Sequence, residues 1–81
     1  MKKAKFGIVD ADVMQDPGLS LRAKGVYGLL ATFARKDRTC YPSITKLGEL
    51  SGTGRRTIER ALKELEEKGY VKREKRIFTL K

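Results

Sequence analysis

Three basic side chains recur along one segment of this chain with the spacing of a helix face, and a fourth precedes them. Arg56, Arg60 and Lys63 are four and three residues apart, and Arg55 stands immediately before them. Residues at these separations are neighbours on a helix surface. A guanidinium can donate two parallel hydrogen bonds to phosphate oxygens, or to O6 and N7 of guanine. The spacing therefore predicts recognition of a phosphate-bearing polyanion, not the making or breaking of bonds.

The surrounding sequence predicts two short helices joined by a tight turn. Ser43 is a suitable N-cap for a helix that ends near Leu50, because its hydroxyl can accept a hydrogen bond from a first-turn N–H. The segment 51–54 contains two glycines and is expected to reverse the chain. A second helix then covers residues 55–68. It ends at Gly69, a residue type that favours the left-handed conformation after a helix.

Apolar residues at helical spacing predict which faces are buried. A longer helix from the N-cap Ser20 to about residue 35 should form the centre of the core, and Gly25 and Gly28 within it should allow a neighbouring element to approach closely. The expected apolar positions are Val26, Tyr27, Leu29, Leu30, Phe33 and Ala34 in this helix, Ile44, Leu47 and Leu50 in the next, and Ile58, Ala61, Leu62 and Leu65 in the last.

The remaining segments predict a small amount of β-structure, which makes the fold class mainly α with a small β-hairpin (α+β). Residues 5–9 favour an edge strand, and residues 10–14 favour a single helical turn followed by a turn at 16–18. Residues 39–41 could pair with a C-terminal hairpin formed by 70–73 and 77–80. Residues Glu74 and Lys75 form the bend of that hairpin, although neither favours a positive φ.

The charge balance favours a polyanionic partner. The chain carries 19 basic and 10 acidic residues among 81, a formal charge of +9. Nucleic acid is the first expectation and an anionic membrane surface the second, while solubility alone is the alternative explanation. In the helix at 55–68 the three arginines lie in the first half, while Glu64, Glu66 and Glu67 lie in the second half, an order that opposes the helix dipole. Function, more than stability, accounts for such an order.

Several kinds of chemistry are poorly supported by the residues present. The chain has no histidine and one cysteine, Cys40, so an internal disulfide and a zinc site are excluded, and a reducing cytoplasm is expected. Gly52 and Gly54 lack the lysine and serine or threonine of a phosphate-binding loop. We therefore predict no enzyme activity, no metal and no cofactor, and expect Cys40 to be a small core residue. No apolar run approaches the roughly 20 residues that cross a bilayer.

Four residues outside the basic stripe have open roles. Glu59 could accept a hydrogen bond from the amino group of cytosine, but an ion pair with Lys63 is favoured. Ser43 and Thr53 are expected to cap helices, and they could also contact phosphate. Tyr41 could touch a sugar-phosphate backbone, although packing is its expected role.

Most of the chain, about residues 19–73, resembles the winged helix-turn-helix domains of plasmid and phage replication initiators and related regulators. The most specific parts of the resemblance are the tyrosine-proline-serine run at 41–43 and the arginine-arginine-threonine run at 55–57. Further parts are leucine-serine at 19–20, the helix at 23–31, and lysine-glycine-tyrosine-valine at 68–71. The family commonly has a serine where this chain has Gly54, and the wing of family members is longer than the wing expected here.

A length of 81 residues predicts a single domain over residues 1–81. Residues 1–18 would form an N-terminal strand and turn, 19–69 a three-helix core with 55–68 as the recognition helix, and 70–81 the wing. The resemblance implies binding to double-stranded DNA in a prokaryotic or phage-encoded cytoplasmic protein. Whether the protein acts as a homodimer or in a larger replication or transcription complex is left open. The predicted DNA-binding residues are Ser43, Thr53, Gly54, Arg55, Arg56, Thr57, Arg60, Lys63, Lys72, Arg73, Lys75 and Arg76.

Two rival hypotheses keep the same fold and change the partner. Winged helices also serve as adaptors between proteins, and a charge of +9 could steer one to an acidic partner. Structured RNA is the weaker rival, because the deep and narrow groove of an A-form helix does not readily admit an α-helix. The sequence alone does not separate a role in replication from one in transcription.

Overall fold

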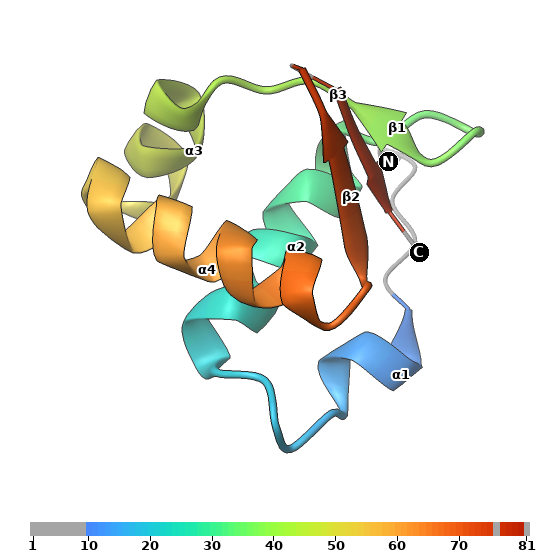
Figure 1. Cartoon of the computed structure of the whole chain (residues 1–81). Helices are drawn as coiled ribbons and strands as arrows, with labels where there is room; N and C mark the ends of the chain where they lie inside the picture. The colour runs from blue at the N-terminus through green and yellow to red at the C-terminus, as the bar shows by residue number, and fades with distance from the viewer. Residues whose placement is uncertain (1–9, 76, 81) are drawn as a thin grey trace, which may run out of the picture.

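The computed structural model describes residues 10–75 and 77–80, and in that part of the chain it confirms an α+β winged helix-turn-helix architecture (Figure 1). The predicted strand at 5–9 and the wing residue Arg76 lie outside the described residues. In chain order the described elements are α1 (Ala11–Met14), α2 (Leu21–Phe33), β1 (Thr39–Cys40), α3 (Ile44–Ser51), α4 (Arg55–Glu67), β2 (Val71–Glu74) and β3 (Ile77–Leu80).

Local capping sets the helix boundaries close to those that the sequence predicts. The hydroxyl oxygen of Ser20 accepts a hydrogen bond from the Ala23 amide at 3.1 Å, and that of Ser43 accepts one from the Lys46 amide at 3.0 Å. Gly69 follows α4 with a φ of 79°, in the left-handed region that glycine tolerates. The helix α2 ends at Phe33, two residues earlier than predicted, because the backbone is extended at the next residue.

The three strands form one antiparallel sheet in the order β1-β3-β2. The strands β2 and β3 make the wing, with Arg73 opposite Phe78, and β1 adds to the free edge of β3 with Thr39 opposite Thr79. The predicted pairing of the segment at 39–41 with the hairpin is thereby confirmed for its first two residues. Lys75 turns the hairpin with a φ of 56°, a conformation that costs a lysine energy.

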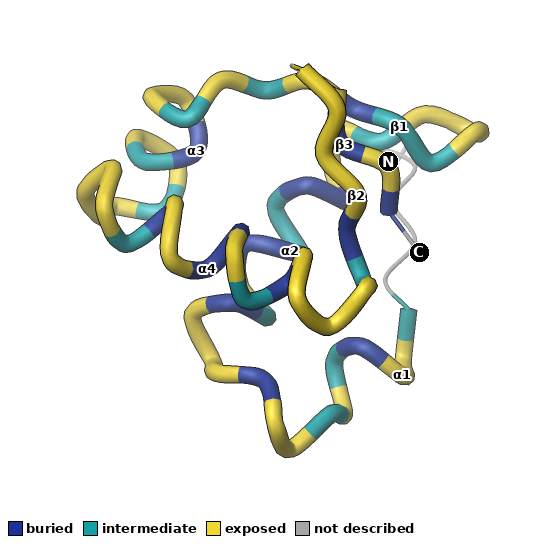
Figure 2. The backbone as a smooth tube through the Cα atoms, viewed as in Figure 1, coloured by how far each residue is buried: buried dark blue, intermediate teal, exposed yellow. Residues whose placement is uncertain are grey.

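The core lies where α2, α3 and α4 meet one face of the sheet, and α2 packs most extensively against α4. All four predicted apolar positions of α4 are buried, and Tyr27, Leu30 and Cys40 are buried beside them. Figure 2 shows buried and exposed residues alternating along α4 with the helical period. Burial of one face of α4 leaves the opposite face outward, where the basic stripe is.

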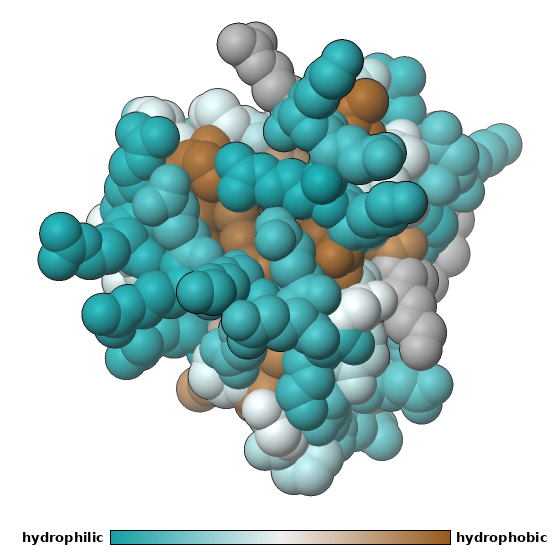
Figure 3. All heavy atoms as spheres, viewed as in Figure 1, coloured by the Kyte–Doolittle hydropathy of each residue, from teal (hydrophilic) through white to brown (hydrophobic). Residues whose placement is uncertain are grey.

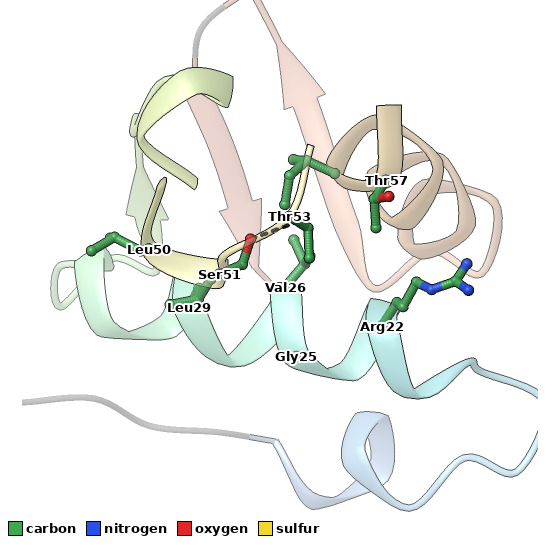
Figure 4. Close-up of a pocket in the computed structure, with 9 residues that line it drawn as sticks. Arg22, Gly25, Val26, Leu29, Leu50, Ser51, Thr53 and Thr57 are labelled. Carbon is green, nitrogen blue, oxygen red and sulfur yellow. Dashed lines mark hydrogen bonds between the residues drawn. The ribbon is translucent and has the colours of Figure 1, made fainter. Parts of the chain in front are cut away.

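Three predictions about α2 and α3 are wrong. Leu50 is 51% exposed instead of buried, and Phe33 is 37% exposed. No heavy atom outside the local helix lies within 4 Å of the position that a Cβ would take at Gly25 or Gly28. The close approach of a neighbouring element that was predicted at these glycines is therefore not found. Gly25 instead lines a hollow of about 340 Å³ between α2 and the end of α3, and Leu50 lies at its rim (Figure 4).

Replacement of Gly28 by alanine should therefore stabilise the protein. The added methyl meets no neighbour, and alanine is favoured over glycine inside a helix by about 1 kcal/mol. Urea unfolding followed by circular dichroism measures the change. Gly69→Ala is the matched control and should destabilise, because its φ is positive. A loss of stability in Gly28→Ala would mean that an element does approach this glycine.

Candidate nucleic-acid interface

The basic stripe of α4 lies in solvent along the face opposite the core. Arg56, Arg60 and Lys63 are exposed, while Ile58 and Leu62 on the other side are buried. Within the described residues, none of the three cations has a carboxylate within 4 Å. Figure 3 shows hydrophilic side chains gathered over the face that α4 and the wing share. These cations are available to pair with an external anion.

The first turn of α4 has no side-chain cap. Gly54 occupies the N-cap position with extended backbone and has no side chain to provide a capping hydrogen bond. The first turn also contains no acidic residue, and Arg55 and Arg56 are found there instead. Cations near a helix N-terminus are unfavourable for the isolated helix, whereas an anion placed there is favourable. The helix start is thus suited to a bound phosphate.

The ion pair predicted between Glu59 and Lys63 is not formed. Glu59 pairs in the opposite direction along the helix, with its Oε2 3.5 Å from Nε of Arg55. Both side chains are largely exposed, and such surface pairs contribute little stability. Because Glu59 lies between the first-turn arginines and Arg60, it partly neutralises the stripe near the start of the helix.

The turn between α3 and α4 is fixed by its own backbone and hydroxyl groups. Gly52 adopts a φ of 73° and ends α3, and the hydroxyls of Ser51 and Thr53 lie 2.8 Å apart (Figure 4). The prediction that Thr53 caps α4 is wrong, since Gly54 takes that position and Thr53 contacts Ser51. Thr57 is half-buried and lines the hollow against α2, at the edge of the basic stripe.

The wing supplies the second group of cations. Lys72, Arg73 and Lys75 are exposed, and the Arg73 guanidinium carbon lies 5.3 Å from the centroid of the Phe78 ring. Arg73 and Lys75 line a hollow of about 300 Å³ together with Ser43, the N-cap of α3. The structure therefore brings two of the wing cations, Arg73 and Lys75, beside the start of α3. Of the predicted wing residues, Arg76 lies outside the described part.

The second half of α4 is bound to the start of α2 by Glu64, a role that local sequence patterns did not reveal. Its Oε1 accepts a hydrogen bond from the Ser20 amide at 2.6 Å, and its Oε2 accepts one from the Ser20 hydroxyl at 2.8 Å. The Ser20 amide hydrogen bond lowers the pKa of the Glu64 carboxyl. A carboxylate at the N-terminus of α2 also suits the dipole of that helix.

A second carboxylate connects the same two regions. The Tyr70 hydroxyl donates a hydrogen bond to Oδ2 of Asp16 at 2.6 Å, and Nζ of Lys68 lies 3.4 Å from the same oxygen. The Tyr70 hydrogen bond is the main reason that the pKa of the Asp16 carboxyl is lowered. Sequence reasoning assigned Asp16 only to a turn, where its Oδ1 does accept from the Gly18 amide at 2.8 Å. Together Asp16 and Glu64 fix the C-terminal end of α4.

The arrangement defines a class of protein. A short positioning helix, a tight turn, a second helix with an outward basic face and a basic wing are the parts of a winged helix-turn-helix DNA-binding domain. The chain belongs to the helix-turn-helix domain family, whose model matches residues 18–71, and membership suggests DNA binding. Comparisons with curated proteins and with solved structures gave no match.

Residues 10–75 and 77–80 contain neither a membrane-spanning helix nor a cluster of metal ligands. None of the helices there is long and apolar enough to cross a membrane. No group of three or more histidine, cysteine, aspartate or glutamate residues in the same part of the chain could hold a metal ion.

The carboxylate of Glu64 should make the protein sensitive to acid. Its pKa is lowered on folding, so its contribution to stability is complete above the ordinary glutamate pKa of about 4.3 and is lost as the pH falls below it. In Glu64→Gln the melting temperature should therefore fall less than in the wild type when the pH is lowered through this range. Glu66→Gln removes the same charge at an exposed position on the same helix, and its melting temperature should fall with pH as much as that of the wild type. Equal acid sensitivity in Glu64→Gln and the wild type would contradict the assignment.

Lys75 should show opposite effects on stability and on DNA binding. Glycine at this position relieves the positive φ, so Lys75→Gly should raise the free energy of unfolding by about 0.5–1 kcal/mol. It should also weaken binding to duplex DNA and reduce the salt slope by roughly one, the effect of one lost phosphate contact. Lys75→Gln is the matched control, with weakened binding and unchanged stability. Unchanged affinity in both variants would remove Lys75 from the interface.

Proposed function

We propose that this protein binds double-stranded DNA by placing the first half of α4 in the major groove and the wing against the flanking backbone. The observation that carries the proposal is the stripe of exposed cations on α4, without ion-pair partners in the described chain and opposite the buried face. The major groove is about 12 Å wide and admits an α-helix. Membership of the helix-turn-helix family supports DNA binding.

The charges of α4 set which end of the helix enters the groove. Arg56 and Arg60 lie in its first half, whereas Glu64, Glu66 and Glu67 follow in the second half. Phosphate attracts the first group and repels the second, so the N-terminal end approaches the DNA most closely. Arg56 and Arg60 would contact base edges or phosphates, and Lys63 would contact phosphate at the groove edge. Arg55 would join them when its ion pair with Glu59 opens.

The wing and the start of α3 would contact the backbone on either side. Arg73 and Lys75 bring two exposed cations beside Ser43, and Lys72 adds a third exposed cation on the same strand as Arg73. Phosphate contacts of this kind fix orientation without reading sequence. The remaining candidates, Thr53, Gly54 and Thr57, would contribute at the margin through the turn and the first amides of α4. Arg76 completes the proposed set from outside the described residues.

We further propose that DNA binding proceeds without catalysis and serves plasmid- or phage-type replication or transcription control in the cytoplasm. Burial raises the pKa of the Cys40 thiol to about 11, which keeps this one cysteine protonated and unreactive. The resemblance to replication initiators favours the replication role. Binding as a pair to two half-sites would raise affinity, as it does for many helix-turn-helix proteins.

Fluorescence anisotropy with a random-sequence duplex tests the proposal. If six to eight phosphates are neutralised, log K should fall with log[salt] at a slope of roughly −5 to −7. The double variant Arg56→Gln/Arg60→Gln should abolish binding at moderate salt and leave folding intact, because both side chains are exposed. Arg22→Gln/Lys36→Gln removes the same charge at exposed positions outside the stripe and should reduce binding far less.

Other outcomes of this titration separate the rival hypotheses. A folded protein that fails to bind any duplex at low salt would favour the adaptor hypothesis. Stronger competition by duplex RNA than by duplex DNA would favour structured RNA. Equal losses in the two double variants would show that total charge, and not the face of α4, drives binding.

A further inference from the structure

Tyr41 is an aromatic residue that the fold leaves in solvent. It follows β1, precedes the N-cap of α3 by two residues, and exposes 52% of its surface. Burying an aromatic side chain is among the larger favourable contributions to a protein core, and a tyrosine has a polar hydroxyl that suits a partly wet site. The proposed duplex interface on α4 does not use this ring.

Two hollows meet at Tyr41. The first, which we call the wing hollow, has a volume of about 300 Å³ and is lined by Arg73, Lys75 and Phe78 from the wing and by residues 41–44. The second, the Phe33 hollow, has a similar volume of about 300 Å³ and is lined by Phe33, Arg35 and residues 40–42. Both volumes fall at the lower end of the range for small-ligand sites.

The Tyr41 ring is held by a cation on the side of the Phe33 hollow. The guanidinium carbon of Arg35 lies 5.4 Å from the ring centroid, within the range of a cation–π contact. Arg35 lines the Phe33 hollow but not the wing hollow. Arg35 therefore lies over one face of the ring, which also borders the wing hollow.

The charged residues that line the two hollows are all cations. Their described linings contain the cations Arg35, Arg73 and Lys75 and no carboxylate. The carboxylate of Asp37 lines neither hollow; it accepts hydrogen bonds from the Thr39 amide at 3.1 Å and the Thr39 hydroxyl at 2.7 Å and is attracted to Arg35, which leaves Arg73 and Lys75 as the cations without this neighbour. An aromatic ring beside clustered cations complements a nucleobase attached to phosphate.

We infer that Tyr41 is a stacking platform for an unpaired base of single-stranded DNA, with Arg73 and Lys75 holding the adjacent phosphates. A base inside a duplex is already stacked on both faces and offers only its edges, whereas an unpaired base offers a free face. Aromatic residues in positively charged grooves bind single strands in this way with little sequence preference. The site goes beyond duplex binding and does not depend on the stripe of α4.

A tryptophan in place of Tyr41 makes the site directly observable. The chain contains no tryptophan, so the fluorescence of the Tyr41→Trp variant reports from this position alone. A deoxythymidine oligomer of about ten nucleotides, added at low salt, should quench that fluorescence saturably because the introduced indole stacks on a base. The matched control is Leu21→Trp, at a residue 84% exposed on α2 and outside both hollows, which should show no quenching.

Anisotropy measurements on further variants separate stacking from other contacts. Tyr41→Leu should weaken binding of the oligomer roughly five- to hundredfold, the range for one stacked base, and Tyr41→Phe should retain it. Duplex affinity should stay unchanged in both variants. When Tyr41→Trp is combined with Arg56→Gln/Arg60→Gln, duplex binding should be lost while quenching by the oligomer persists. A failure of the single-strand site can therefore be distinguished from a failure of the duplex interface.

Three results would overturn the assignment. The first is unquenched fluorescence in a folded Tyr41→Trp variant at low salt. The second is equal weakening of duplex and single-strand binding by Tyr41→Leu, which would make Tyr41 a contact to the duplex backbone. The third is markedly tighter binding of a uridine oligomer than of the deoxythymidine oligomer, which would make RNA the ligand.

Discussion

The orientation of α4 is the constraint on which the rest of the structure depends. Its apolar face packs against α2 and α3, and Leu62 and Leu65 are almost fully buried there. Rotation of the helix about its axis would expose these leucines, at a cost of about 1.5–3 kcal/mol for each. The same packing therefore determines that Arg56, Arg60 and Lys63 face outward together. The core and the proposed DNA interface are two faces of a single helix.

The unusual charge order along α4 has two separate causes. Glu64 in the second half binds the amide and hydroxyl of Ser20, so it joins α4 to the beginning of α2. Asp16 and Tyr70 make a second connection a few residues further on. Among the described residues, the cations of the first half make no comparable long-range contact and are left for an external anion. The acidic end thus anchors the helix, while the basic end is available for binding.

Local features of the fold were predictable from sequence, and long-range ones were not. The caps Ser20 and Ser43, the turn after α4 and the buried face of α4 all follow from residue type and spacing over a few positions. The bond from Glu64 to Ser20 spans 44 residues and leaves no local pattern. The prediction for Leu50 failed because periodicity shows which side of a helix is apolar, but not whether the neighbouring element supplies atoms to cover it.

The most direct test of the account is to map the DNA-binding face by NMR. Amide shifts of the isotopically labelled protein would be followed while a random-sequence duplex is added at low salt. The account predicts the largest changes at residues 54–63 and 72–75, with small changes in α1 and around residues 66–68. Changes concentrated on α2 and the C-terminal end of α4, with residues 54–63 unaffected, would contradict it.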